Sequence, residues 1–300
     1  MSKIYYRMSS LYVQAGGDGV DVERTPLSSI LGKNASSIKA RAIQALQALH
    51  PQEHKITDTQ ARPDRQVFKP SGIKDPITGA DMITTDFEPV ARVPIRIQRY
   101  IVSQKASFAR GNGVTLKPSN ENSEVFKRVY DNWYANKTDF YLKEIAEAYL
   151  GETQVGVVFF NDFEDGEKDL DKYRLRFKIL KPSKGDFLYP IYDPRTEKLI
   201  AVCREYEVGD KTIYDQYIAP EKKGQKVKLR TYEGIDNDEY TEVELNFTKL
   251  PIIIWEREEA ECEDTQEAIE VLEKSFSDFL DQVEYTGDPI LFGKGRTIDM

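Results

Sequence analysis

Cysteine, histidine and long apolar runs are all scarce in this chain of 300 residues, which has two cysteines and two histidines. Cys203 and Cys262 lie far apart without Cys or His neighbours, so neither a disulfide framework nor a zinc site is expected. His50 and His54 are four residues apart, but Pro51 and the polar residues around them argue against a rigid pair of metal ligands. We therefore expect no metal and no other cofactor.

Membrane and secretory segments are also missing. The longest apolar runs, Val155–Phe160 and Ile252–Trp255, are strand-sized and far shorter than the roughly 20 residues of a spanning helix. The N-terminal stretch Met1–Arg7 does not lead into the apolar core of a signal peptide. We expect no membrane contact and synthesis in a reducing cytoplasm.

Positive charge is in deficit, with 42 Lys and Arg against 51 Asp and Glu and a formal charge of −9. The excess is local: the residues from Pro251 to Tyr285 hold twelve acids and two bases, Arg257 and Lys274, while the rest of the chain sums to +1. This balance argues against a protein that coats a polyanion. The 40% hydrophobic content is that of a folded protein.

Residues 1–85 form a predicted polar N-terminal arm with one short helix. Apolar residues recur near a spacing of 3.6 over Ala35–Leu49, which predicts that helix. The stretch His50–Gly79 holds four prolines and two glycines, too many turn-forming residues for a packed element. We expect it to be an extended arm or linker.

Residues 86–262 form a predicted α+β domain. Three helices are expected first, at Pro94–Arg110, 122–135 and 139–150, because apolar stripes of helical spacing end at glycine or polar turns. Seven β-rich runs follow, of which the first two form a predicted hairpin: Gln154–Phe160, Tyr173–Leu180, Ile200–Tyr206, Thr212–Ile218, Val227–Tyr232, Glu242–Phe247 and Pro251–Trp255. No long helix separates consecutive strands, so helices packed on an antiparallel β-region are expected, and a doubly wound parallel sheet is not.

Residues 263–286 form a predicted long, acidic, amphipathic helix. Asp264 and Glu267 match an N-terminal capping pattern. Apolar residues then alternate in steps of three and four: Ile269, Leu272, Phe276, Phe279 and Val283. About two heptads are too few for a free-standing coiled coil, so this stripe is expected to pack against other elements. A short apolar piece follows Pro289, and residues 287–300 look like an interrupted segment.

Several motifs, taken in order, resemble the portal proteins of tailed bacteriophages. They are "ILKP" at 179–182, "PIYDPRTEKLIAVCREY" at 190–206 and "KLPIIIW" at 249–255, followed by the acidic helix. That family shows a comparable tyrosine-aspartate turn, an arginine-tyrosine strand and a proline-initiated strand before its first stem helix. The resemblance covers about Asp86 to Gly295.

The resemblance implies a non-enzymatic subunit of a ring, typically a dodecamer, at one vertex of the capsid. Double-stranded DNA would be packaged and ejected through the ring without sequence specificity. The implied partners are further copies of the chain, the large terminase subunit, the major capsid and scaffolding proteins, and a head-tail adaptor. The implied location is the virion, after assembly in the host cytoplasm.

The same resemblance assigns parts of the chain to the regions of a portal subunit. Residues 86–262 look like the wing, 263–286 like the first stem helix and 287–300 like the start of the clip. A second stem helix, a tunnel loop and a crown do not fit after Gly287. The chain is therefore expected to be a fragment or a truncated gene product.

Two sets of residues on the last helix are candidates for function. A channel through which DNA slides should not bind phosphates, because each Lys or Arg contact releases counterions and adds affinity. Four acids are candidates for the channel wall, with Lys274 as a transient phosphate contact: Glu267, Glu270, Asp278 and Asp281. The stripe from Ile269 to Val283 is the candidate for packing between subunits. A plain surface helix with a buried stripe explains the same pattern equally well.

Two functions of other classes remain open at this stage. The acidic cluster from Glu256 to Asp264 is compatible with a metal-dependent phosphodiesterase or nuclease, although such sites need carboxylates from separate elements. A scaffold or adaptor that docks a partner through the 265–284 helix is the other alternative.

Overall fold

The computed structural model describes residues 22, 25–111, 113–118, 123–162, 174–193, 195–236 and 239–287. It divides into two compact units. The first unit joins Met1–Leu49 to Gln98–Glu263, and the second joins His50–Ile97 to Asp264–Met300. The expected α+β class is confirmed, since helices accompany antiparallel sheets.

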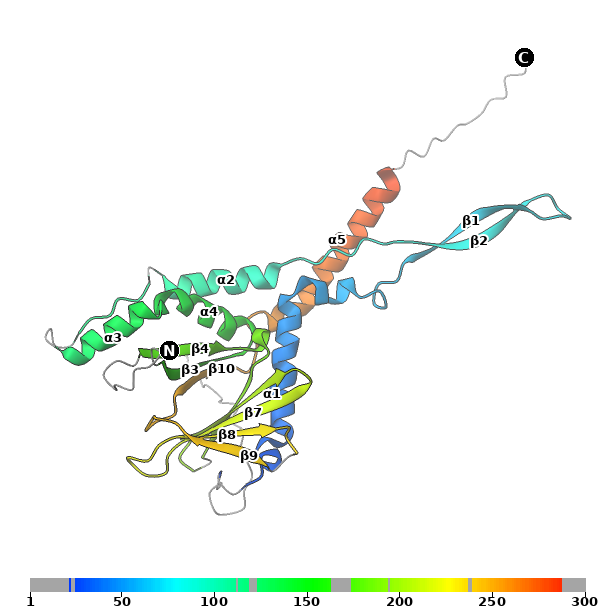
Figure 1. Ribbon diagram of the computed structural model, residues 1–300. Helices are drawn as coiled ribbons and strands as arrows, with labels where there is room; N and C mark the ends of the chain where they lie inside the picture. Colours follow the sequence, from blue (N-terminus) through cyan, green and yellow to red (C-terminus); the bar gives the residue numbers. More distant parts are fainter. Residues whose placement is uncertain are drawn as a thin grey trace. The chain divides into compact units, whose positions relative to one another are not determined.

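Two antiparallel sheets form the centre of the first unit (Figure 1). The larger has the order β5-β6-β7-β8-β9, with strands Phe187–Tyr192, Leu199–Val208, Lys211–Ile218, Lys228–Glu233 and Tyr240–Glu244. The smaller has the order β10-β3-β4, with strands Ile252–Glu256, Gln154–Asp162 and Arg174–Leu180. The predicted β3–β4 hairpin is confirmed, with Val157 opposite Ile179. The six remaining strands include β5, which the sequence patterns did not predict.

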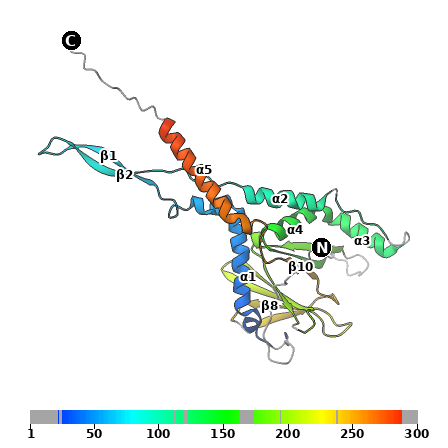
Figure 2. The same cartoon turned by 180° about the vertical axis from the view of Figure 1, so that it is seen from behind.

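The core of the first unit is layered. Leu188, Val202 and Tyr217 of the larger sheet meet apolar side chains of the smaller sheet: Val158, Leu180 and Ile252. On the outer face of the smaller sheet, Ala148 of helix α4 (Thr138–Gly151) packs in one cluster with Val155 and other apolar residues. On the outer face of the larger sheet lies helix α1 (Leu27–Leu49), as Figure 2 shows from behind. The two sheets are thus enclosed between helices.

Gly156 of β3 lies against the Leu188 side chain of β5. A Cβ atom built on this glycine would lie 2.5 Å from Cδ1 of Leu188. That distance is well inside van der Waals contact, so a larger residue here would require the Leu188 side chain to shift.

All three helices predicted for residues 86–150 are confirmed. They are α2 (Ile97–Arg110), α3 (Glu124–Ala135) and α4. Ser123 caps α3, because its hydroxyl accepts a hydrogen bond from the Phe126 N–H at 3.2 Å. Helix α1 begins eight residues earlier than predicted and is kinked at Gly32, whose φ of 47° is left-handed.

Regular elements that the sequence analysis did not predict lie within His50–Gly79, the stretch predicted as an arm or linker. This segment contains 3₁₀ turns at Pro51–Glu53 and Lys55–Thr57, and then strand β1 (Arg65–Lys74), which pairs with β2 (Asp81–Glu88). The two prolines of the hairpin lie at positions where they do not interrupt the pairing of β1 with β2. Pro70 is the last paired residue before the register shifts, and Pro76 lies in the turn that the Gly79 N–H closes onto the Asp75 carbonyl.

The second unit also holds helix α5 (Gln266–Gly287), preceded by a 3₁₀ turn at Glu263–Thr265. The predicted helix over 263–286 is confirmed within a few residues. Residues 288–300, which include most of the predicted clip-like segment, lie outside the described residues. Within the described part of the chain, no helix combines the length and apolar character that crossing a membrane requires.

Candidate functional site

Helix α5 buries a polar side against its own unit. Four residues spaced by four lie on this side: Ile269, Glu273, Ser277 and Asp281. Glu273 and Ser277 are almost completely buried, and the Asp281 side chain is only 11% exposed. Buried polar groups are costly unless they form hydrogen bonds. The partners of these side chains therefore explain the orientation of the helix.

An extended segment of the second unit supplies those partners. The backbone N–H groups of three alternate residues donate to the three polar side chains: Ala91 to Asp281 Oδ1 at 2.6 Å, Val93 to Ser277 Oγ at 3.1 Å and Ile95 to Glu273 Oε1 at 2.8 Å. Two residues of extended chain rise about 6.6 Å and four helical residues about 6 Å, so the two spacings match. The three hydrogen bonds therefore form a regular row between the backbone of residues 91–95 and one side of α5.

His54 also contacts the carboxylate of Glu273. Its Nδ1 lies 2.6 Å from Oε1 of Glu273, and both side chains are at most 2% exposed. The second carboxylate oxygen, Oε2, is buried without a hydrogen-bond partner among the described atoms. Glu273 thus joins α5 to both ends of the 50–97 segment.

Arg62 forms a second anchor further along the helix. Its Nη1 lies 2.7 Å from Asp278 Oδ1, its Nη2 lies 2.5 Å from Asp281 Oδ2, and its Nε donates to the Ala91 carbonyl at 2.8 Å. One planar guanidinium therefore bridges two helical carboxylates and the extended segment. The sequence analysis missed Arg62, because nothing in a polar, proline-rich stretch indicates a partner more than 200 residues away.

The apolar stripe of α5 lies on another side of the helix, about 110° around from the buried polar side. Leu272, Phe276, Phe279 and Val283 are between 45% and 56% exposed. Ile269, which the sequence pattern grouped with them, is instead buried. These four side chains, hereafter the exposed stripe, form an apolar surface about 17 Å long, because eleven residues separate Leu272 from Val283 and each rises about 1.5 Å.

The candidate channel residues lie roughly opposite the exposed stripe around the helix, as the 100° turn per residue requires. Three of the four acids have basic neighbours: Asp278 and Asp281 pair with Arg62, and Glu270 Oε2 lies 3.6 Å from Lys55 Nζ. A depression of about 340 Å³ lies beside Glu267, Glu270 and Lys274. The side is thus acidic but more nearly neutral than the sequence of the helix alone indicates.

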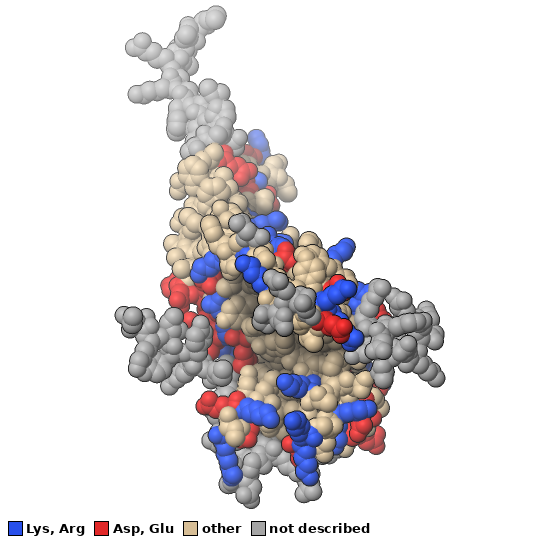
Figure 3. Space-filling model, turned by 90° about the vertical axis from the view of Figure 1, so that its left-hand side faces the viewer, with Lys and Arg blue, Asp and Glu red and all other residues tan. Residues whose placement is uncertain are grey.

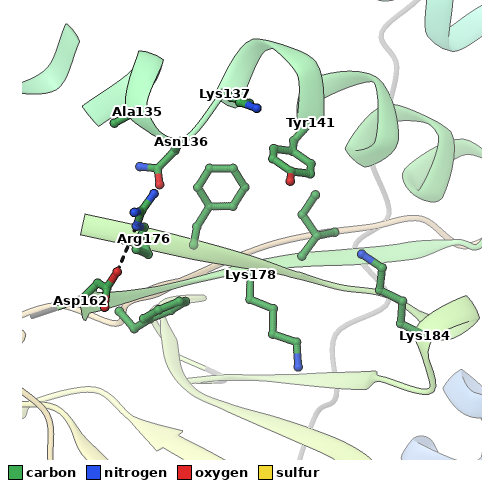
Figure 4. A pocket seen from close by; sticks show the side chains of 11 residues that line it. Ala135, Asn136, Lys137, Tyr141, Asp162, Arg176, Lys178 and Lys184 are labelled. Carbon is green, nitrogen blue, oxygen red and sulfur yellow. Dashed lines mark hydrogen bonds and ion pairs between the residues drawn. The ribbon is translucent and has the colours of Figure 1, made fainter. Parts of the chain in front are cut away.

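The first unit has pockets that are larger than this depression. Basic, acidic and apolar side chains are mixed in their linings. One of about 720 Å³ lies between the turn joining α3 to α4 and strands β3 and β4. Figure 4 shows Arg176 of β4 paired with Asp162 of the neighbouring β3, while Lys178 points away from Tyr141. Among the described residues, its lining includes no His, Cys or Ser and therefore no Ser–His or Cys–His pair. On the face drawn in Figure 3, basic and acidic side chains are interspersed with uncharged surface.

The acidic run from Glu256 to Asp264 does not form one cluster. Burial raises the pKa of Glu256 to about 7, whereas Glu261 pairs with Lys105 and with Arg257, the latter at 3.1 Å. Over the residues that the structure describes, no group of three or more His, Cys, Asp and Glu side chains is placed to hold a metal ion. The alternative of a metal-dependent nuclease therefore has no convergent carboxylates in this run.

Comparison with known proteins gives one match. Residues 88–299, more than two thirds of the chain, match the family model described as "Phage portal protein, SPP1 Gp6-like". None of the curated proteins matches the chain. The match begins at the end of β2 and includes all of α5.

Proposed function

The chain belongs to the SPP1 Gp6-like family of phage portal proteins, and from this membership we propose that it is a subunit of a homo-oligomeric ring at the capsid vertex. In this role the protein performs no chemistry, and double-stranded DNA is packaged and ejected through the hole in the ring. The large terminase subunit, the capsid and scaffolding proteins and a head-tail adaptor dock on it during assembly in the host cytoplasm.

The exposed stripe of α5 is the observation that carries this proposal. A helix in a monomeric protein turns its apolar side inward, because burial of apolar surface stabilises the fold. Here polar side chains occupy the buried side, and four large apolar side chains face outward. A contiguous exposed apolar surface is typical of an interface with another protein. In a ring, the contact is made with a neighbouring copy.

The opposite side of α5 is proposed to face the DNA. The Asp281 side chain is only 11% exposed and also accepts a hydrogen bond from Ala91, so the wall is formed by the more exposed Glu267, Glu270, Lys274 and Asp278. Acidic side chains repel phosphates, and the nearby bases Lys55 and Arg62 keep that repulsion moderate. A weakly acidic wall lets DNA move without stalling at phosphate contacts.

Negative-stain microscopy combined with light scattering tests the proposal. The unmodified chain should form rings with a central hole, more readily at moderate than at low salt, because acidic segments of neighbouring copies repel each other most at low ionic strength. The double variant Phe276→Ser/Phe279→Ser should lose the rings. The matched control Val271→Ser, which alters an exposed residue of α5 outside the stripe, should keep them.

Two outcomes would contradict this proposal. An unmodified chain that stays monomeric at high concentration in both salts does not form the ring. Rings that persist in the double variant would show that the exposed stripe is not the interface.

A further inference from the structure

The β1–β2 hairpin has two unlike faces. Directly paired residues point to the same side of a two-stranded sheet, and the side alternates along each strand. One face is built by three pairs: Gln66 with Phe87, Phe68 with Thr85, and Pro70 with Ile83. The other face is built by Arg65 with Glu88, Val67 with Asp86, and Lys69 with Thr84. The first face is largely apolar and the second is largely charged.

The second face forms ion pairs within the hairpin itself. Nζ of Lys69 lies 3.2 Å from Oδ2 of Asp86 and 3.0 Å from Oε1 of Glu88. Both acids come from the opposite strand, so the ion pairs bridge β1 and β2. We expect this charged face to remain in contact with water.

The apolar face is uncovered. Phe68 is 71% exposed, Ile83 is 73% exposed and Phe87 is 63% exposed. A two-stranded hairpin alone is at best marginally stable in water, and it needs further strands or packing against a helix. The apolar face of this hairpin therefore calls for a cover that the described part of its own chain does not provide.

A surface of the required kind is present on the same unit. The exposed stripe of α5 is also apolar and also uncovered, so the two surfaces do not cover each other within one chain. Their lengths agree: Ile83 to Phe87 spans about 13 Å of strand, against the stripe of about 17 Å. The neighbouring contacts in a ring join two different patches of identical subunits, so each subunit must carry both halves of the interface.

We propose that the apolar face of the β1–β2 hairpin packs on the exposed stripe of α5 in a neighbouring copy of this chain. The inference rests on the proposed ring and names the two surfaces that meet in it. The hairpin of each subunit then covers the next stem-like helix, and the contact repeats around the ring. The acidic side of α5 stays free of this contact, because it lies roughly opposite the stripe.

Thr84 and Thr85 offer a matched pair for the test. They are adjacent, both exposed and identical in chemistry, but Thr85 lies on the apolar face and Thr84 on the charged face. Ser275 is exposed on α5, three residues after Leu272 and four before Phe279. The native Cys203 and Cys262 are buried and should react slowly.

The experiment co-expresses two differently tagged chains and treats them with a short bismaleimide. One chain carries Ser275→Cys, and the other carries either Thr85→Cys or Thr84→Cys, so that only a contact between subunits gives the mixed dimer. Light scattering on the same samples reports the assembly state. The proposal expects a strong mixed dimer with Thr85→Cys and its loss to background with Thr84→Cys.

Each other outcome overturns the proposal in a distinguishable way. Assembled particles with no mixed dimer, or with equal dimer from both variants, would reject the hairpin contact while the proposed ring stands. Chains that remain monomeric and unlinked would reject both.

Discussion

His54 and Glu273 are 219 residues apart in the sequence, yet Nδ1 of the histidine lies 2.6 Å from Oε1 of the glutamate in an almost solvent-free contact. The same oxygen accepts a hydrogen bond from the Ile95 N–H. This carboxylate therefore holds the 50–97 segment to α5 at two places. It is also the reason that a polar side of the helix can face inward and leave the apolar stripe outside.

The variant Glu273→Ala should lower the free energy of unfolding by about 3 kcal/mol, because removal of one partner leaves buried polar groups unpaired. The control Glu284→Ala removes an exposed acid from the same helix and should change stability by about 0.5 kcal/mol or less. Urea unfolding of both variants provides the comparison. Equal effects would show that the buried carboxylate has no special role.

The variant Arg62→Lys should loosen the extended segment without unfolding the protein. Lysine keeps the charge, but it cannot bridge Asp278, Asp281 and the Ala91 carbonyl with one planar group. Hydrogen exchange at the amides of residues 91–95 should become faster, with little change in the first unit. Arg65→Lys, at the exposed start of β1, should leave these amides unchanged. Unaltered exchange in Arg62→Lys would refute the anchor.

The variant Gly156→Ala should destabilise the first unit by about 1–3 kcal/mol, because its Cβ would press on Leu188. The cost should shrink when Leu188 is also changed to alanine, since the added methyl group then has space. A double-mutant cycle on unfolding free energies measures this coupling. Strictly additive effects would mean that the two positions do not touch.

Glu256 should give the stability a specific pH dependence. Burial raises its pKa from 4.5 to about 7, so the folded state binds this proton more tightly than the unfolded state. The stabilisation is complete below pH 4.5, falls as the pH rises to about 7 and is absent above it. The total is at most about 3–4 kcal/mol, from 1.36 kcal/mol per pH unit.

The matched variant for this test is Glu256→Gln, which has no proton to lose. Between pH 4.5 and 7, the unfolding free energy of the parent should fall relative to that of the variant. If the difference in unfolding free energy between the parent and the variant does not change with pH, the pKa of Glu256 is not raised.

The elements of the first unit were largely predictable because their patterns are local. The alternation in β4 and the helical stripe of α4 each follow from a few adjacent residues. Strand β5 escaped prediction because Pro190 interrupts it, which the chain tolerates since β5 is an edge strand. The β1–β2 hairpin escaped for the same reason, as its prolines and glycines were taken for a linker.

Only one part of the candidate site on α5 could be predicted from the sequence. The spacing from Leu272 to Val283 correctly indicated an apolar stripe, but it did not show which side of the helix is covered. That choice depends on Glu273 and Ser277, whose partners are backbone N–H groups of a distant segment. Backbone donors leave no trace in side-chain patterns, so the polar buried side was not visible in the sequence. The role of Arg62 was not visible because its carboxylate partners lie more than 200 residues away.

The mass and shape of the unmodified chain test the central claim most directly. Each subunit has a mass of 34.5 kDa. The account predicts particles whose mass is a multiple of this value and which appear as rings with a central hole in negative stain. A single species of 34.5 kDa at low and moderate salt, with no rings at high protein concentration, would contradict it.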